Sequence, residues 1–567
     1  MSRFLSYILL SVSATMLPLA VIAQEQNLSE KIDQVFGQLT GWFVNAIFWS
    51  IPFSEQWQVP WVLIVLVGGA LYFTIYFNFV NITQLKTAIN VVRGKYETIE
   101  KHGLDHLYGD LTPGDDIPET IRYEKPDKKE HLEGDLTPGG DEPGTIRDES
   151  ADGEVSHFQA LTAALSATVG LGNIAGVAVA LSIGGPGATF WMIVAGLLGM
   201  SSKFAECTLG VKYRDVDADG TVYGGPMYYL SKGLKEMGMA GLGKVLAVIF
   251  AIMVVGGSFG GGNMFQANQA AAQFIELFDL SSFGAIMFGI VMAILVGIVI
   301  IGGIKRIASV TEKVVPFMAG IYVLAALVIL VANFSLIDDA FSLIIEGAFS
   351  GLGIAGGLVG VLIQGIRRGA FSNEAGVGSA AIAHSAVRTK FPVSEGLVAL
   401  LEPFIDTVVI CTMTALVIII TNIQGGFFVY GSPITQGVEL TSTAFDTVIP
   451  NFSVVLTIAV ILFAFSTMIS WSYYGMQGWL YLFGRGRTTD LVYKGLFVVF
   501  VVVGASIKLD SVINFSDAMI FAMVVPNIIG VIILAPKVRV ELKKYLKATK
   551  EYNRFQRQQK KAHRKAS

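Results

Sequence analysis

Runs of about 20 apolar residues recur along most of the chain and are separated by short polar connections. Because a run of that length crosses the hydrocarbon core of a bilayer as a helix, the pattern predicts an all-α polytopic membrane protein. The predicted spans lie at about 61–81, 155–188, 188–211, 242–274, 283–303, 310–334, 337–366, 397–422, 454–483, 491–507 and 513–534.

One of these runs, Val155 to Ala188, is interrupted at its centre. Val169 to Gly176 holds three glycines and an asparagine where a simple spanning helix would place Leu or Val. Non-helical backbone at this depth is tolerated only where its polar groups are buried in protein or line a polar cavity. Secondary transporters use such broken helices to hold a cation and a substrate. A glycine-lined packing seam between helices is the alternative.

A second glycine-rich interruption follows five spans later. The apolar piece 337–350 is too short to cross, meets the glycines of Ser350 to Gly357, and continues at 358–366. Interruptions at corresponding places in successive blocks predict a five-plus-five inverted repeat with two broken helices. The repeats are expected at 155–334 and 335–535, and an extra N-terminal spanning helix at 60–82.

The remaining segments are polar or charged. Residues 1–23 resemble a cleavable signal peptide, with a retained helix as the alternative. Residues 24–59 predict an extracytoplasmic interfacial segment. Residues 83–154 form an acidic insertion with an internal duplication, which is either a tolerated loop or a regulatory or cation-binding segment. Residues 536–567 form a basic tail that could touch anionic lipid or simply set topology.

Charge and composition narrow the class further. The chain has 53% hydrophobic and 15% charged residues, which argues against a soluble enzyme. Basic residues fall on alternate connections, and this predicts a multi-pass protein of a bacterial-type inner membrane, with the N-terminus outside and the C-terminus in the cytoplasm. The two cysteines, Cys207 and Cys411, lie far apart in apolar runs, so neither a disulfide framework nor a metal site is expected.

Five longer motifs follow one another along the apolar part of the chain: GLGNIAGVA at 170–178, GGPGATFWM at 184–192, FSNEAGVGSAAIAHSA at 371–386, LEPFIDTVVICTMTAL at 401–416 and ISWSYYG at 469–475. Together they resemble the alanine/glycine:cation symporter family. The resemblance covers about 61–534 and implies the leucine-transporter-type fold with sodium-coupled uptake of alanine or glycine. Leu171, where many members carry Thr, and the acidic insertion depart from the family pattern.

The resemblance also implies where sodium, the co-transported ion, would bind. The fold's shared sodium site joins the first and eighth core helices, at the backbone of Ser166 and Val169 and the hydroxyls of Ser466 and Thr467, with the Phe463 carbonyl completing it. Without the family resemblance, the hydroxyls of Ser466 and Thr467 are more typical of side chains that hydrogen-bond to the backbone of their own helix.

A transported amino acid must exchange water for donors at its carboxylate and acceptors at its ammonium group. The first interruption offers amide donors for the carboxylate, and the second offers carbonyl acceptors for the ammonium group. Gln266 is a further candidate, because a carboxamide at this depth is costly unless it has hydrogen-bond partners. Trp471 lies one helical turn after Thr467 and could cap a pocket of alanine size; a packing Trp is the alternative. The predicted substrate-binding residues are Gly170, Gly172, Asn173, Gln266, Ser350, Gly351, Gly353, Thr467 and Trp471.

Several charged residues are candidates for inner-gate pairs or, equally, for structural ion pairs: Lys203, Glu206, Glu374, Glu402 and Asp406. His157 and His384 are expected to be interfacial histidines rather than proton carriers. No carboxylate is evident beside Val169 to Gly176, which argues against proton coupling.

The sequence therefore predicts a sodium-coupled importer of alanine or glycine that works by alternating access. A proton-coupled or broader-specificity neutral amino acid transporter is the main alternative, and a non-transporting membrane sensor is a weaker one. No nucleophile, metal or acid-base constellation suggests an enzyme, an organic cofactor or a nucleic-acid partner. The two dissimilar interruptions do not suggest a channel filter.

Overall fold

The structure is a computed structural model that describes residues 27–54, 57–102, 153–218, 220–280, 282–350, 357–431 and 437–566 of the 567. The predicted signal peptide and residues 103–152 of the acidic insertion, which include its duplication, therefore lie outside the described residues. The described part is built from helices, with two short antiparallel strand pairs, β1 with β2 and β3 with β4.

The elements, in chain order, are α2 (Asn27–Ile47), β1 (Ser50–Pro52), β2 (Gln58–Pro60), α3 (Trp61–Tyr76), α4 (Val80–Thr83), α5 (Leu85–Val92), α6 (Glu97–His102), α8 (His157–Thr168), η2 (Gly172–Gly176), α9 (Val177–Gly184), α10 (Gly187–Lys212), β3 (Asp215–Val216), β4 (Val222–Tyr223), α11 (Pro226–Tyr228), η3 (Tyr229–Gly233), α12 (Leu234–Glu236), α13 (Ala240–Phe259), η4 (Gly260–Met264), α14 (Phe265–Phe278), α15 (Ser282–Ile300), α16 (Gly303–Ala332), η5 (Phe334–Leu336), α17 (Ile337–Ser350), α18 (Gly357–Asn373), α19 (Ala380–His384), α20 (Pro392–Ala399), α21 (Leu401–Pro403), η6 (Phe404–Cys411), α22 (Thr412–Gly425), α23 (Val438–Asp446), α24 (Phe452–Phe483), α25 (Arg487–Ser506) and α26 (Leu509–Ala566).

The helices confirm an all-α polytopic membrane protein. Within the described residues, seven helices are long and apolar enough to cross a bilayer, or eight if the bent pair α8 and η2–α9 counts as one span. The extra N-terminal helix α3 and the apolar part of α15 are shorter. The inverted-repeat relation between the two halves stays a prediction.

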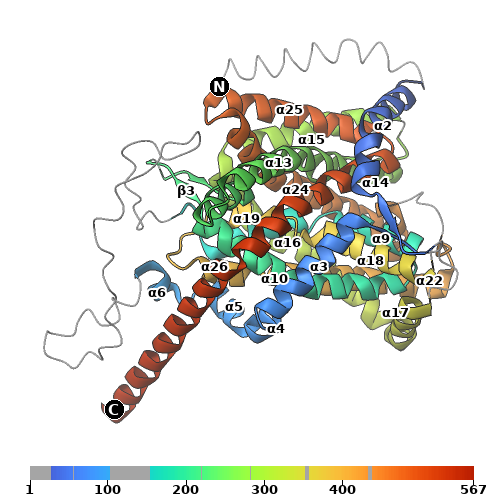
Figure 1. Cartoon of the computed structure of the whole chain (residues 1–567). Coiled ribbons are helices and arrows are strands. Elements are labelled where there is room, and N and C mark those ends of the chain that lie inside the picture. Colours follow the sequence, from blue (N-terminus) through green and yellow to red (C-terminus); the bar gives the residue numbers. More distant parts are fainter. Residues whose placement is uncertain are drawn as a thin grey trace, which may run out of the picture.

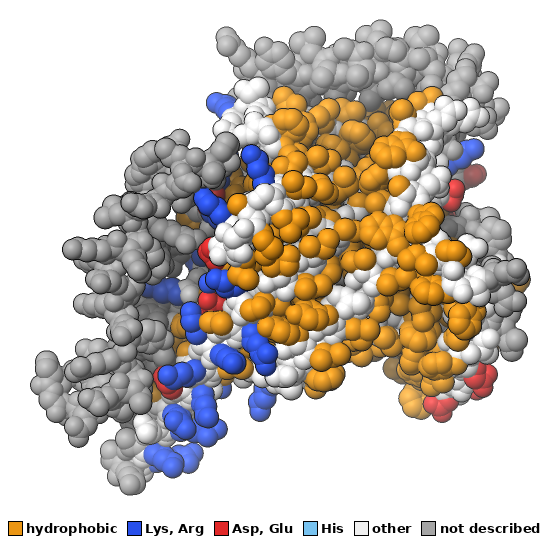
Figure 2. Space-filling model, viewed as in Figure 1, with side chains coloured by type: hydrophobic (Ala, Val, Ile, Leu, Met, Phe, Trp, Pro, Cys, Tyr) orange, Lys and Arg blue, Asp and Glu red, His pale blue; other side chains and the backbone are white. Residues whose placement is uncertain are grey.

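The last helix is longer than expected. α26 runs without a break through the boundary predicted between the last span and the basic tail, although it contains Pro526 and Pro536. It extends well beyond the bundle, with α3 lying beside it (Figure 1). The face that Figure 2 shows is largely apolar, and its Lys and Arg side chains gather toward the projecting end of α26. That distribution is typical of a membrane protein with one basic rim.

The predicted interfacial segment contributes a helix, α2, that packs against α26. The ring of Phe36 meets that of Phe515 at 5.0 Å, and the ring of Phe48 meets that of Phe521 at 5.7 Å, both edge to face. These contacts tie the segment before the extra helix to the end of the chain.

The first predicted interruption is present. α8 ends at Thr168, the chain bends by 51°, and helical geometry resumes in the π-helical turn η2. Ser156 and Gln159 close the start of α8 with a capping box. Every residue from Val169 to Gly176 is buried. The backbone polar groups that lose their helical partners therefore face protein or a cavity.

The second interruption differs from the expectation. α17 ends at Ser350, which is exposed, and the predicted break at Gly351 and Gly353 lies outside the described residues. The structure shows a further interruption, between the end of α18 at Asn373 and the start of α19 at Ala380, in which every residue is buried.

This further interruption belongs to the segment 371–384, which was not among the predicted spans or interruptions. The polar groups of the segment form hydrogen bonds with buried partners rather than with water. The length of an apolar run along the sequence cannot reveal such hydrogen bonds.

Candidate functional site

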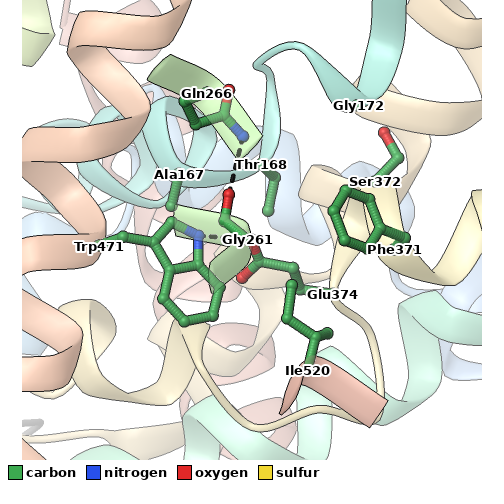
Figure 3. Close-up of a pocket in the computed structure, with 10 residues that line it drawn as sticks. All are labelled: Ala167, Thr168, Gly172, Gly261, Gln266, Phe371, Ser372, Glu374, Trp471 and Ile520. Atoms are coloured by element: carbon green, nitrogen blue, oxygen red, sulfur yellow. Dashed lines mark hydrogen bonds between the residues drawn. The ribbon is translucent and has the colours of Figure 1, made fainter. Parts of the chain in front are cut away.

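A small pocket lies where the unwound segment after α8 approaches the end of α18 (Figure 3). Three residues predicted for the substrate site, Gly172, Gln266 and Trp471, contribute to its lining. The full lining is Ala167, Thr168, Gly172, Gly261, Gln266, Phe371, Ser372, Glu374, Trp471 and Ile520.

Close packing explains the glycines of the first interruption. A methyl group on Gly170 would lie 2.4 Å from the Thr467 hydroxyl, and one on Gly172 would lie 3.3 Å from the Ser372 backbone. Glycine therefore lets the unwound segment approach both α24 and α18.

The predicted sodium-binding residues of α8 and α24 are brought together. The Ser166 hydroxyl donates to the Ser466 carbonyl at 2.7 Å, and the Thr467 hydroxyl donates to the Ser166 carbonyl at 2.9 Å. The Ser466 hydroxyl donates to the Phe463 carbonyl at 3.0 Å. Val169 caps the end of α8, where the backbone turns out of helical geometry. These oxygens form a buried, uncharged cluster beside the pocket.

Gln266 links the unwound segment to another interrupted helix. Its Oε1 accepts a hydrogen bond from the Leu171 backbone at 3.2 Å, and its Nε2 donates to the Gly261 carbonyl at 3.0 Å (Figure 3). Gly261 belongs to the π-helical turn η4, at which the span α13–α14 changes geometry. The predicted cost of a carboxamide at this depth is thus offset by two backbone partners.

Both polar atoms of the Asn173 side chain form hydrogen bonds within the protein. Its Oδ1 accepts the Gly170 backbone N–H at 2.9 Å, and its Nδ2 donates to Asp406 Oδ1 at 2.6 Å and to the Asp406 carbonyl at 3.1 Å. The geometry makes Asn173 a residue that positions the unwound segment, and it does not line the pocket.

The Asp406 contact corrects one expectation from the sequence. A buried carboxylate does lie beside Val169 to Gly176, although none was evident there. Asp406 lies 233 residues after Asn173, and only the packing of η6 against η2 brings the two together. The one available signal was an acidic residue within the apolar run FIDTVVIC, which is costly in a membrane unless it has partners.

The same carboxylate also reaches the end of α18, where the further interruption begins. Asp406 Oδ2 accepts hydrogen bonds from the Ser372 hydroxyl at 2.8 Å and from the Thr407 hydroxyl at 2.7 Å. The Thr407 hydroxyl in turn accepts from Asn373 Nδ2 at 2.9 Å. Asp406 therefore connects the unwound segment after α8 to the end of α18 through neutral donors.

Trp471 lies on the wall of this pocket. Its Nε1 donates to Glu374 Oε1 at 2.9 Å (Figure 3), and its ring packs against a face of η4 where a methyl group on Gly262 would lie 2.3 Å from Trp471. Glu374 was predicted as an inner-gate residue, but the structure places it in the pocket lining.

Two other predicted gate residues, Lys203 and Glu402, belong to a buried chain of charges, whereas Glu206 accepts a hydrogen bond from Asn527 Nδ2 at 2.6 Å. Lys203 Nζ pairs with Glu402 at 3.0 Å, and both side chains are fully buried. The other oxygen of Glu402 contacts one ring nitrogen of His384, whose second ring nitrogen contacts Glu395.

Glu395 also contacts His157 at the start of α8, and the second ring nitrogen of His157 meets Glu100 at 3.2 Å. Glu100 accepts a further hydrogen bond from the Tyr545 hydroxyl of α26. The expectation of interfacial histidines is wrong for His384, which is fully buried, because carboxylates on both sides supply its partners.

Comparison with known proteins agrees with this architecture. The sequence pattern of the sodium:alanine symporter family matches residues 143–560. The sodium/alanine symporter AgcS of Methanococcus maripaludis is 43% identical over 397 residues, which cover 70% of this chain and 85% of that protein.

Two relatives from Bacillus subtilis are more distant. The putative sodium/proton-dependent alanine carrier protein YrbD is 36% identical over 414 residues, or 71% of this chain and 83% of that protein. The probable sodium/glutamine symporter GlnT is 34% identical over 399 residues, or 70% of this chain and 80% of that protein. With most of its length matched by the family pattern and by these relatives, the chain belongs to the sodium:alanine symporter family.

Proposed function

We propose that this chain carries alanine or glycine into the cell together with sodium by alternating access. The observation that supports this most is that two candidate sites adjoin one unwound segment. Just before the segment, Ser166 contacts the Ser466 carbonyl and the Thr467 hydroxyl, and the following turn lines the pocket at Gly172.

Sodium would be bound by the carbonyls of Ser166, Val169 and Phe463 and by the hydroxyls of Ser466 and Thr467. Carbonyl and hydroxyl oxygens suit a hard monovalent cation, and broken helices in transporters coordinate Na⁺ in this way. In the structure several of these oxygens bond one another, so sodium would replace protein hydrogen bonds with its own coordination.

The substrate would lie in the pocket beside Gly172. Gln266 and Ser372 offer hydrogen-bonding groups, whereas Phe371, Trp471 and Ile520 provide an apolar wall. The cavity there has a volume of about 10 Å³, room for about one water molecule, so the pocket would have to widen to admit an amino acid, and a methyl group would require less widening than a long side chain. The 43% identical relative is named for alanine, which agrees with a small substrate, whereas GlnT is named for glutamine.

Coupling between the two ligands follows from the shared segment. Sodium at its start and substrate at its next turn would both favour the same backbone arrangement, so each would raise the affinity for the other. The Asp406 links to Asn173 and Ser372 would transmit the ordering to the interruption between α18 and α19.

Proton coupling is the second candidate. Asp406 is fully buried, lies beside the unwound segment and is hydrogen-bonded by neutral groups, as a proton-carrying carboxylate could be. The relative YrbD is named as sodium/proton-dependent.

The proposed location is a bacterial-type inner membrane with the N-terminus outside and the C-terminus in the cytoplasm. The basic residues near the end of α26 support a cytoplasmic end that contacts anionic lipid (Figure 2).

Uptake by proteoliposomes tests both candidates. Labelled alanine and glycine should accumulate when an inward sodium gradient is imposed, and should not accumulate with an inward proton gradient in sodium-free buffer. Accumulation driven by the proton gradient alone would favour the second candidate. Failure of both gradients to drive either amino acid would refute the proposed function.

A further inference from the structure

Glu374 differs from the other nine described residues that line the pocket, because it alone is charged (Figure 3). Its side chain is 2% exposed, and it accepts hydrogen bonds from Trp471 Nε1 and from the Ser379 hydroxyl. Both donors are neutral. Within the described part of the chain, no basic side chain lies at ion-pair distance from Glu374; the buried Lys203 is paired with Glu402 and attracts Glu374 only from farther away.

A buried carboxylate without a positive partner is costly, and a cationic group brought by a ligand would remove that cost. A cargo that carries positive charge would give Glu374 the direct cationic partner that it lacks.

The backbone holds this carboxylate in place at a conformational cost. Glu374 has a φ of 56°, in the left-handed region that few residues other than glycine adopt. Asn373 fixes the turn, since its Oδ1 accepts the Ala375 backbone N–H at 2.9 Å and its Nδ2 donates to Thr407 at 2.9 Å. Strained backbone that is fixed by its surroundings is common at ligand sites.

The rest of the lining suits the other parts of an amino acid. The backbone of Gly172 and the side chains of Ser372 and Gln266 are neutral and polar, as partners of a carboxylate can be. Phe371 and Ile520 are apolar. The pocket therefore offers one negative group, several neutral polar groups and an apolar wall.

We infer that the Glu374 carboxylate binds the α-ammonium group of the transported amino acid. It thereby selects amino acids over 2-hydroxy acids of the same size. This inference rests on the proposed function, because it names the part of the cargo that Glu374 recognises.

Binding of L-alanine and L-lactate to the purified full-length protein in sodium buffer tests the inference by calorimetric titration. The two ligands share the carboxylate and the methyl group, but lactate carries a hydroxyl in place of the ammonium. Removing one partner of a buried charge pair weakens binding by at least about 30-fold. The wild type should therefore prefer alanine by about 30-fold or more.

Glu374→Gln should weaken alanine binding by a similar factor and leave lactate binding within a few-fold of wild type, so that the preference collapses. Glu374→Asp keeps the charge and should keep the preference. Glu346→Gln is the matched control, since it removes an exposed carboxylate on α17 and should change neither ligand.

Three results would overturn the inference. They are equal binding of alanine and lactate by the wild type, unchanged alanine binding by Glu374→Gln, and loss of ²²Na⁺ binding in Glu374→Gln with the alanine preference retained. Equal binding of alanine and lactate by the wild type would overturn the inference even if Glu374→Gln does not fold. If the wild type carries a different amino acid, the proposed function fails separately, and that amino acid is compared with its own 2-hydroxy acid.

Discussion

The side chains of Asn173 and Asp406 meet at 2.6 Å, amide donor to carboxylate acceptor, although 233 residues separate them in the chain. This hydrogen bond joins the unwound turn after α8 to the π-helical segment η6. Since the Asn173 carboxamide also accepts from Gly170, one side chain sets both the local backbone and its distance from the neighbouring helix.

Asn173→Asp should abolish most uptake, because it places two carboxylates at hydrogen-bonding distance in a buried site. Asp406→Asn should also impair uptake, since Asn173 then faces another amide. The double variant Asn173→Asp/Asp406→Asn restores one carboxylate and one amide and should recover part of the activity. Sodium-driven alanine uptake measures this. A double variant no better than either single one would contradict the positioning role.

Thr467→Ala should weaken the response to sodium. The hydroxyl contacts the Ser166 carbonyl at 2.9 Å, and a lost buried polar partner costs about 1–3 kcal/mol, or roughly 5- to 150-fold in affinity. The sodium concentration for half-maximal uptake should rise accordingly, and Thr467→Ser should restore it.

Ser472→Ala is the matched control, because this hydroxyl on the same helix bonds only its own backbone, at Ile469. An equal loss of sodium response in the control would show that any buried hydroxyl of α24 matters, and the sodium assignment would lose its support.

Gly262→Ala should reduce alanine binding. The added methyl group would lie 2.3 Å from Trp471, so the indole or η4 must shift, and overpacking of this kind costs about 1–3 kcal/mol. Because the Trp471 indole donates a hydrogen bond to Glu374, the shift should displace groups that line the pocket. Gly241→Ala, at a position on α13 with open space, should bind alanine normally. Normal binding by Gly262→Ala would mean that the Trp471 position does not shape the pocket.

Lys203→Met should destabilise the protein by about 3–5 kcal/mol, because it leaves Glu402 buried without its amine partner. Lys203→Met/Glu402→Gln should be less destabilised than Lys203→Met. Thermal unfolding in detergent compares the variants. Lys544→Met removes an exposed pair with Glu541 and should cost at most about 1 kcal/mol. If Lys203→Met unfolds like Lys544→Met, the buried chain of charges contributes little to stability.

The sequence alone was enough to predict the membrane class, the approximate position of the spans and the first interruption. Apolar run length reports directly on whether a helix can cross a bilayer, and three glycines around Asn173 are a local signal. The contacts of Ser166 with Ser466 and Thr467 were anticipated only because the family resemblance paired the first and eighth core helices. The proposed sodium and substrate roles remain predictions.

Tertiary structure alone decided which polar groups share a partner. Asp406, Ser372 and Glu374 looked like isolated polar residues or parts of a connection, and packing placed the first beside Asn173 and the other two in the pocket lining. Composition and periodicity describe one helix at a time, whereas burying a carboxylate depends on donors that distant helices bring to it. For this reason the spans could be predicted from the chain, but the network that joins them could not.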